Sequence, residues 1–122
     1  MITMIDGIGI DIVELEDIKK RMNEAFLKRI LSNEEYQRYL SINDLGRQIA
    51  FVAGRFAAKE AYTKAYGVFE TPLMFSEVSI TQSENQKPVL KSQYRSLDIC
   101  DVSISHSEHY AVAIVVLQKK DQ

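Results

Sequence analysis

The chain has 122 residues and a mass of 14.0 kDa, enough for one compact domain over 1–122 and too little for two ordinary ones. Fifteen basic residues against seventeen acidic ones give a net charge of −2, which argues against nonspecific binding to nucleic acid or to a membrane surface. Cys100 is the only cysteine, and neither a basic leader nor an apolar run of membrane-spanning length occurs, so we expect a cytoplasmic protein without disulfide bonds.

Residues 8–13 have the period of a β-strand, because isoleucines occupy alternate positions while Gly9, Asp11 and Val13 share the opposite face. Residues 15–31 then change to helical spacing. The apolar stripe of this segment comprises Ile18, Met22, Ala25 and Phe26. We therefore predict that a strand leads directly into a helix.

Two further helices are expected before the middle of the chain. Residues 32–35 read SNEE, the pattern of a capping box in which a hydroxyl and a carboxylate satisfy free backbone amides, so a second helix is predicted over 33–39. A longer third helix is predicted over 47–66. It should end at Gly67, since glycine tolerates the left-handed conformation that is common after a helix.

The C-terminal half indicates strands separated by turns, over residues 75–81, 89–91, 101–106 and 110–118. The last two strands are joined by only a few residues, a length that favours an antiparallel hairpin. The last strand is apolar on both faces and should lie in the middle of the sheet. This order of elements predicts an α+β fold in which three helices cover a small, mostly antiparallel sheet.

The long helix carries two charged faces. At about 100° per residue, Glu60 and Lys64 lie on one side among alanines, while Arg55 and Lys59 share another side. One interpretation of Glu60 and Lys64 is an ordinary surface pair of residues i and i+4, worth about 0.2–0.5 kcal/mol. The other is a site in which small alanines leave room for a ligand beside the carboxylate.

Asp11 helps to decide between a surface ion pair and a ligand site. Aspartate is depleted in strands, and here it interrupts a run of isoleucine and valine beside Gly9. Asp11 could cap the following helix or simply face water. Alternatively, Asp11 and Glu60 could share Mg²⁺, which takes few protein carboxylates and completes its shell with water and phosphate oxygens. Lys64, one helical turn beyond Glu60, would then meet those phosphates.

His106 ends the strand 101–106 where the chain must turn, a position suited either to a hydrogen-bonded turn residue or to a ligand contact. With two histidines and one cysteine in the chain, zinc chemistry is not expected. Neither a phosphate-binding GxxxxGK[ST] loop nor a GxSxG nucleophile motif occurs in the sequence.

Three stretches together resemble the holo-acyl-carrier-protein synthases, the small 4′-phosphopantetheinyl transferases of bacterial fatty-acid synthesis. They read GIGIDIVEL at the start, FVAGRFAAKEAYTKA in the long helix and VSISHSEHYAVAIVVL at the end, in the order and spacing of that family. The resemblance implies an enzyme that transfers phosphopantetheine from coenzyme A to a serine of acyl carrier protein, releases adenosine 3′,5′-bisphosphate and needs Mg²⁺.

The resemblance also implies roles for individual residues. The catalytic set would be Asp11, Glu60 and Lys64, with both carboxylates on the metal and the lysine on the pyrophosphate. His106 falls on a histidine that contacts coenzyme A. The family's further positions near the nucleotide fall on Arg47, Arg55 and Pro88. The family is commonly a homotrimer whose active sites lie between adjacent subunits.

This sequence departs from the family pattern in the turn often written NGKP, which here reads NQKP with Gln86 in place of glycine. The loop after Gly67 also differs, as does Asp101 before VSISH. The first helix presents cations beside its apolar stripe, and the resemblance implies that the acidic carrier protein docks there, on Arg21, Met22 and Lys28.

Two other functions would use parts of the same sequence. A Mg²⁺-dependent phosphohydrolase acting on a nucleotide would use the same carboxylates and lysine, but with water as the acceptor. A carrier-binding module without enzymatic activity would need neither the metal nor the two carboxylates. A transfer assay with added carrier protein distinguishes the three.

Overall fold

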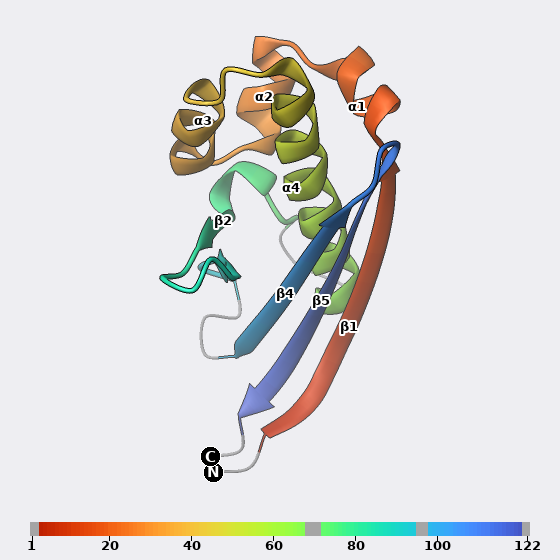
Figure 1. Cartoon of the computed structure of the whole chain (residues 1–122). Helices are drawn as coiled ribbons and strands as arrows, with labels where there is room; N and C mark the ends of the chain where they lie inside the picture. Colours follow the sequence, from red (N-terminus) through yellow and green to blue (C-terminus); the bar gives the residue numbers. More distant parts are fainter. Residues whose placement is uncertain (1–2, 68–71, 95–97, 121–122) are drawn as a thin grey trace.

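The structure is a computed structural model that describes residues 3–67, 72–94 and 98–120 (Figure 1). Five strands, four α-helices and one short 3₁₀ helix make up the described part of the chain. In chain order they are β1 (Thr3–Glu14), α1 (Leu15–Arg21), α2 (Glu24–Ile30), α3 (Asn33–Leu40), α4 (Leu45–Tyr66), η1 (Phe75–Glu77), β2 (Ser79–Gln82), β3 (Pro88–Lys91), β4 (Ile99–His106) and β5 (Tyr110–Lys120).

The strands form two antiparallel sheets. The larger has the order β1-β5-β4, and the smaller pairs β2 with β3. Figure 1 shows α4 running along one face of the larger sheet, with α1, α2 and α3 gathered towards one end of the molecule. The predicted α+β class is confirmed, and so is the central position of the apolar last strand, β5.

Helix α4 packs unusually close to β1, and two glycines explain why. A Cβ atom on Gly7 would lie 1.9 Å from the carbonyl oxygen of Ala65, and one on Gly9 would lie 1.9 Å from that of Ala61. Any side chain at either glycine would push the helix away from the strand. The room that Gly9 provides is therefore filled by the backbone of α4 itself.

The helices beyond β1 differ from the prediction. The segment 15–31 forms two helices, because the side chain of Asn23 accepts a hydrogen bond from the backbone nitrogen of Phe26 (2.8 Å) and so caps a new helix, α2. The break ends the single predicted stripe: Ile18 and Phe26 are buried, but Ala25 is exposed. The described residues thus contain four α-helices, one more than predicted.

Other predicted boundaries largely match. The capping box at Ser32 and Glu35 is present at the start of α3. Asp44 caps α4, which ends at Tyr66 before Gly67 with a positive φ of 91°. The strand predicted over 75–81 begins only at Ser79, since the preceding residues form η1. The loop after Gly67 begins with residues 68–71, which lie outside the described residues. Among the described helices none has the length and apolar character needed to cross a membrane.

Candidate active site

Asp11, Glu60 and Lys64 come together where β1 meets α4. Asp11 Oδ1 lies 3.0 Å from Lys64 Nζ, which also donates to the carbonyl oxygen of Ile10 at 2.9 Å. The side chain of Asp11 is 17% exposed and that of Lys64 is 55% exposed, so the pair is reachable from solvent. The close approach of α4 to β1 at Gly9 brings these groups within contact distance.

Glu60 completes this cluster electrostatically. Partial burial is the main cause that raises the pKa of Glu60 above its usual value of 4.5, and the negative charge of Asp11 raises it further. Lys64 and Arg21 oppose the shift, which places the cation of Arg21 near the same carboxylate. A carboxylate whose charge is destabilised by a neighbouring carboxylate in this way is suited to sharing a cation with that neighbour.

These two carboxylates fit Mg²⁺ rather than a metal held entirely by protein. Within residues 3–67, 72–94 and 98–120, no group of three or more histidine, cysteine, aspartate or glutamate residues could hold a metal ion. Mg²⁺ is commonly held by one or two carboxylates, with water and phosphate oxygens as its other ligands. Asp11 and Glu60 meet that requirement and leave most of the coordination shell to a phosphate-bearing ligand.

A second group of predicted residues surrounds a cavity of about 240 Å³. Arg47, Arg55 and His106 all line it, together with Ala50 and other residues of α3, α4 and β2. The ring nitrogen Nε2 of His106 lies 2.9 Å from the carbonyl oxygen of Ala50 and therefore carries the hydrogen of this bond. A Cβ on Gly54 would lie 2.9 Å from that same nitrogen, so the glycine in GRFAA makes room for the imidazole.

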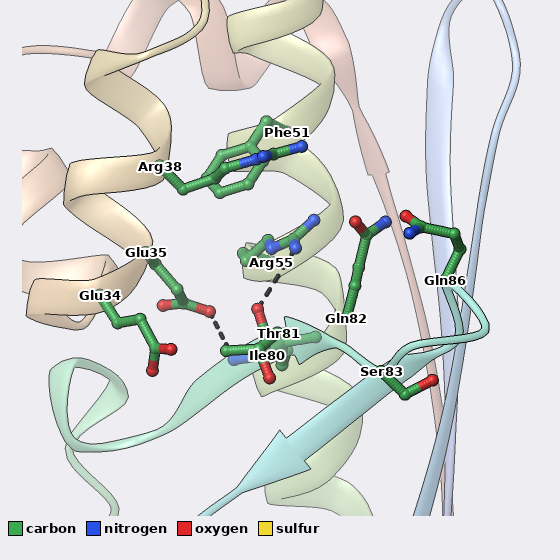
Figure 2. A pocket seen from close by; sticks show the side chains of 10 residues that line it. All are labelled: Glu34, Glu35, Arg38, Phe51, Arg55, Ile80, Thr81, Gln82, Ser83 and Gln86. Carbon is green, nitrogen blue, oxygen red and sulfur yellow. Dashed lines mark hydrogen bonds between the residues drawn. The ribbon is translucent and has the colours of Figure 1, made fainter.

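An adjoining cavity of about 380 Å³ shares Arg38, Phe51, Arg55 and Gln82 with the first (Figure 2). The guanidinium carbon of Arg55 lies 4.1 Å from the centre of the Phe51 ring, and one terminal nitrogen donates to the carbonyl oxygen of Ile80 at 3.2 Å. The Nε of Arg55 is buried and has no hydrogen-bond partner among the described residues. Such a donor suits a site that a polar ligand completes.

The two guanidinium groups of this cavity suit an anionic ligand, although the carboxylates of Glu34 and Glu35 line it too. Burial lowers the pKa of Arg55, and the nearby cation of Arg38 lowers it further, while Glu35 opposes the shift. A phosphate beside the two guanidinium groups would relieve their mutual repulsion. Arg38 gives no signal in the sequence, because it stands in an ordinary amphipathic helix without a motif.

The two groups face different sides of α4. Arg55 precedes Glu60 by five residues, which turns it by roughly 140° around the helix axis. Across the sheet, Asp11 lies on β1 and His106 on β4, with β5 between them. The structure thus brings together Asp11, Glu60 and Lys64, the metal-side residues. Separately, it brings together Arg47, Arg55 and His106, the nucleotide-side residues.

The sequence profile of the 4′-phosphopantetheinyl transferase superfamily matches residues 7–115. The chain belongs to this superfamily. The matched range includes every predicted site residue of both groups, so this transferase carries its candidate site within the region that defines the family. The predicted resemblance is confirmed.

Known relatives of this transferase are holo-[acyl-carrier-protein] synthases. The protein from Anoxybacillus flavithermus is 47% identical over 119 residues, covering 95% of this chain and 98% of the relative. The structure of the Bacillus anthracis enzyme in complex with CoA (3′,5′-ADP) has a TM-score of 0.87 at 42% identity, covering 96% and 99% of the two chains. The Helicobacter pylori enzyme in complex with coenzyme A has a TM-score of 0.74 at 32% identity, covering 90% and 98%.

The turn before Pro88 forms one edge of the larger cavity. Pro88 opens β3 opposite Gln82, a position where a missing backbone donor costs little. In place of the family's glycine, Gln86 adopts a φ of 64°, so the turn keeps a conformation that glycine would favour. The side chain of Gln86 lines the cavity, whereas Pro88 is not among its lining residues.

The predicted partner-binding residues lie around the break between α1 and α2. Arg21 and Lys28 are exposed, and Met22 is half-buried. The guanidinium carbon of Arg21 lies 4.8 Å from the centre of the Phe26 ring, while Lys28 pairs with Glu24 at 2.8 Å. Because Arg21 also influences Glu60, this surface adjoins the metal-side cluster.

Next to the site lies a buried ion pair that the sequence does not indicate. Lys59, which the helical spacing places on a charged face with Arg55, is fully buried and pairs with Glu35 of α3. Lys59 also donates to the carbonyl oxygens of Ile30 (2.8 Å) and Phe75 (3.0 Å). Glu35 in turn accepts from the backbone nitrogen of Ile80 at 2.8 Å. The capping box gives one indication in the sequence. It directs the carboxylate of Glu35 back to the start of α3, and that end of the helix is buried in the structure.

Proposed function

We propose that this transferase moves the 4′-phosphopantetheine group of coenzyme A to a serine of apo acyl carrier protein, thereby activating the carrier for fatty-acid synthesis. The observation that carries the proposal is that Asp11 of β1 meets Glu60 and Lys64, which lie one turn apart on α4, at one solvent-reachable point. The names of the relatives and the coenzyme A complexes among them support the two substrates. A cytoplasmic location, in keeping with the single cysteine, belongs to the same proposal.

Asp11 and Glu60 would hold Mg²⁺, which would supply charge neutralisation on the pyrophosphate of coenzyme A. The serine oxygen of the carrier forms a bond to the β-phosphorus as the bond between the two phosphates breaks, and the serine loses its proton. Adenosine 3′,5′-bisphosphate leaves with the electron pair of the broken bond. Lys64, which the Asp11 carboxylate and the Ile10 carbonyl hold in place, would donate to the leaving phosphate as its charge grows.

The nucleotide of coenzyme A would lie in the two adjoining cavities. Arg47, Arg55 and His106 would bind its phosphates, since they gather cationic and hydrogen-bonding groups around one hollow. Arg55 is held by its stacking on Phe51 and its bond to Ile80, so it needs little ordering when the ligand binds.

Mass spectrometry of the carrier protein tests this function directly. Incubation of the enzyme with coenzyme A, Mg²⁺ and apo acyl carrier protein should add one phosphopantetheine group to the carrier. Hydrolysis of coenzyme A without any carrier adduct would instead indicate a phosphohydrolase. Carrier binding that needs neither metal nor coenzyme A would indicate a binding module.

We also propose that the active enzyme is a homotrimer with sites between subunits. The outer face of β1 supports this, because it presents a row of large apolar side chains, each 60–70% exposed: Ile5, Ile8, Ile10 and Ile12. A row of this kind on a free chain indicates an interface. The metal-side and nucleotide-side residues lie on different sides of α4. This supports active sites between subunits, since the metal-side residues of one copy could then face the nucleotide-side residues of its neighbour.

Ile10→Glu is expected to convert the trimer to monomers and to abolish most transfer, because a carboxylate would be buried in the apolar contact. Sedimentation equilibrium gives the mass, and circular dichroism should remain that of a folded chain, since Ile10 is 60% exposed. Leu40→Glu, at an exposed leucine of α3, is the matched control and should stay trimeric. A fully active Ile10→Glu monomer would contradict shared sites.

The carrier protein would dock on the surface formed by Arg21, Met22 and Lys28. Lys28→Glu should raise KM for the acidic carrier several-fold and flatten its salt dependence, while KM for coenzyme A stays nearly unchanged. Arg21→Glu should act in the same direction, with an additional effect through its neighbour Glu60. Equal changes for both substrates would show instead an ordinary solvated surface.

A further inference from the structure

Arg21 is the last residue of α1, and its guanidinium group lies over two aromatic rings. The guanidinium carbon is 4.8 Å from the ring centre of Phe26 on α2 and 5.3 Å from that of Phe56 on α4. The centres of these two rings are 6.2 Å apart. Contact with two aromatic faces limits the positions that an exposed arginine can take. The cation is thus held beside α4, although no carboxylate within the described parts of the chain forms an ion pair with it.

Phe56 places this cation at one end of the metal-side cluster. Phe56, Glu60 and Lys64 follow one another at intervals of four residues, so they share one side of α4 on successive turns. Arg21 lies over the first of these turns, and the ammonium group of Lys64 belongs to the last. Burial and the charge of Asp11 raise the pKa of Glu60, whereas the cations of Lys64 and Arg21 lower it. Along the helix, Glu60 therefore lies between two cations.

The direction of the proposed reaction gives the two cations different tasks. In-line transfer puts the entering and leaving oxygens on opposite sides of the phosphorus. Lys64 would contact the leaving phosphate. The opposite end of the cluster, at Arg21, adjoins the surface on which the carrier would dock, so the serine would enter from there. The phosphoryl group that passes between these ends carries negative charge on its non-bridging oxygens throughout the transfer.

We propose that Arg21 is a catalytic residue that donates hydrogen bonds to the non-bridging oxygens of the phosphoryl group being transferred, on the side where the serine enters. The inference rests on the proposed function and deepens it, because docking of the carrier is there the only task of Arg21. The guanidinium group keeps all its protons while the bond from serine to phosphorus forms and the bond between the two phosphates breaks. Its planar pair of donors matches two phosphoryl oxygens, a geometry that a lysine ammonium group does not provide.

Arg29 offers a comparison on the same surface. Its guanidinium carbon lies 5.7 Å from the ring centre of Phe26, and its side chain is exposed like that of Arg21. Arg29 is not, however, among the charges that act on Glu60. Two exposed arginines therefore lie over one ring, and Arg21 is the one that also borders the metal-side cluster.

Steady-state kinetics of the complete enzyme at saturating coenzyme A and saturating carrier test the inference, because saturation removes the contribution of docking. Arg21→Gln should lower kcat about 100-fold, the usual effect of losing one donor to a transition state. Arg21→Lys keeps the charge that attracts the carrier and should still lose a large part of kcat, since lysine lacks the planar pair of donors. Arg29→Gln is the matched control and should keep the kcat of the wild type, whatever its KM for the carrier.

Thermal unfolding with and without Mg²⁺ distinguishes a direct contact from an effect through Glu60. Mg²⁺ should raise the melting temperature of both Arg21 variants at least as much as that of the wild type, because Arg21 is not a proposed ligand of the metal. A slow variant that has lost this rise would overturn the inference, since Arg21 would then act through the metal site or the fold.

The kinetic result decides between catalysis and docking. A wild-type kcat in Arg21→Gln, with a higher KM for the carrier alone, would overturn the inference, leave Arg21 as a docking residue and leave the proposed function standing. A wild-type enzyme that adds no phosphopantetheine to the carrier would overturn the proposed function and the inference together.

Discussion

Asp11→Asn and Glu60→Gln are each expected to lower the rate of phosphopantetheine transfer by at least about 100-fold, because each removes a negative charge from the proposed metal site without changing the volume of the side chain. Mass spectrometry of the carrier protein measures the rate. Glu16→Gln, at an exposed glutamate of α1, is the matched control and should retain normal turnover.

A second measurement separates metal binding from a general loss of structure. Mg²⁺ should raise the melting temperature of the wild type and have a much smaller effect on either variant, since only a folded chain with both carboxylates holds the ion well. If Glu60→Gln kept near-normal turnover at limiting Mg²⁺, the proposed metal site would be wrong.

The pH dependence of stability gives an independent check on Glu60. Burial and the neighbouring charge of Asp11 raise the pKa of Glu60 above its usual value of 4.5. The folded chain therefore holds this proton more tightly than the unfolded chain does, so the contribution of Glu60 to stability is largest at low pH and is lost as pH rises through the raised pKa. Glu60→Gln should consequently be more stable than the wild type at neutral pH, with the difference shrinking as pH falls towards 4.5.

Lys59→Met is expected to destabilise the fold by about 3–5 kcal/mol, the usual cost of removing one partner from a buried ion pair. Glu35 would remain as a buried carboxylate with backbone partners only, and the carbonyl oxygens of Ile30 and Phe75 would each lose a donor. Urea unfolding measures this loss.

The double variant Lys59→Met with Glu35→Gln tests whether the two side chains act as a pair. Its destabilisation should be clearly smaller than the sum of the two single changes, because the second substitution removes the unpaired charge that the first one leaves. Lys28→Met, in the exposed pair with Glu24, is the control and should leave the unfolding midpoint nearly unchanged. A Lys59→Met protein as stable as the wild type would contradict this account.

The same pair is expected to affect the donor site. Glu35 holds the Ile80 peptide, which also accepts from Arg55, so loss of Glu35 or Lys59 should loosen the wall of the larger cavity. A rise in KM for coenzyme A that exceeds the rise in KM for the carrier would show this coupling.

Much of the local structure could be predicted from the sequence, because the groups that determine it are neighbours in the chain. The capping box needs only Ser32 and Glu35, and the end of α4 needs only Gly67. The hairpin between β4 and β5 follows from a short connection, and the central place of β5 follows from apolar residues on both of its faces. Asp11, Glu60 and Lys64 were likewise predicted to lie together, from the residue type of Asp11, the helical spacing of Glu60 and Lys64 and the family motifs that contain all three.

The tertiary structure decided what depends on partners far apart in the sequence. The local sequence around Lys59 is typical of an exposed helix face. Lys59 is nevertheless buried, because Glu35, 24 residues earlier, pairs with it between the packed helices. The space that Gly9 leaves on its face of β1 is taken by α4, which thereby carries Glu60 and Lys64 to Asp11. The separation of the metal-side and nucleotide-side residues has the same origin: residue order sets the angle around a helix, but only packing determines what each side of that helix faces.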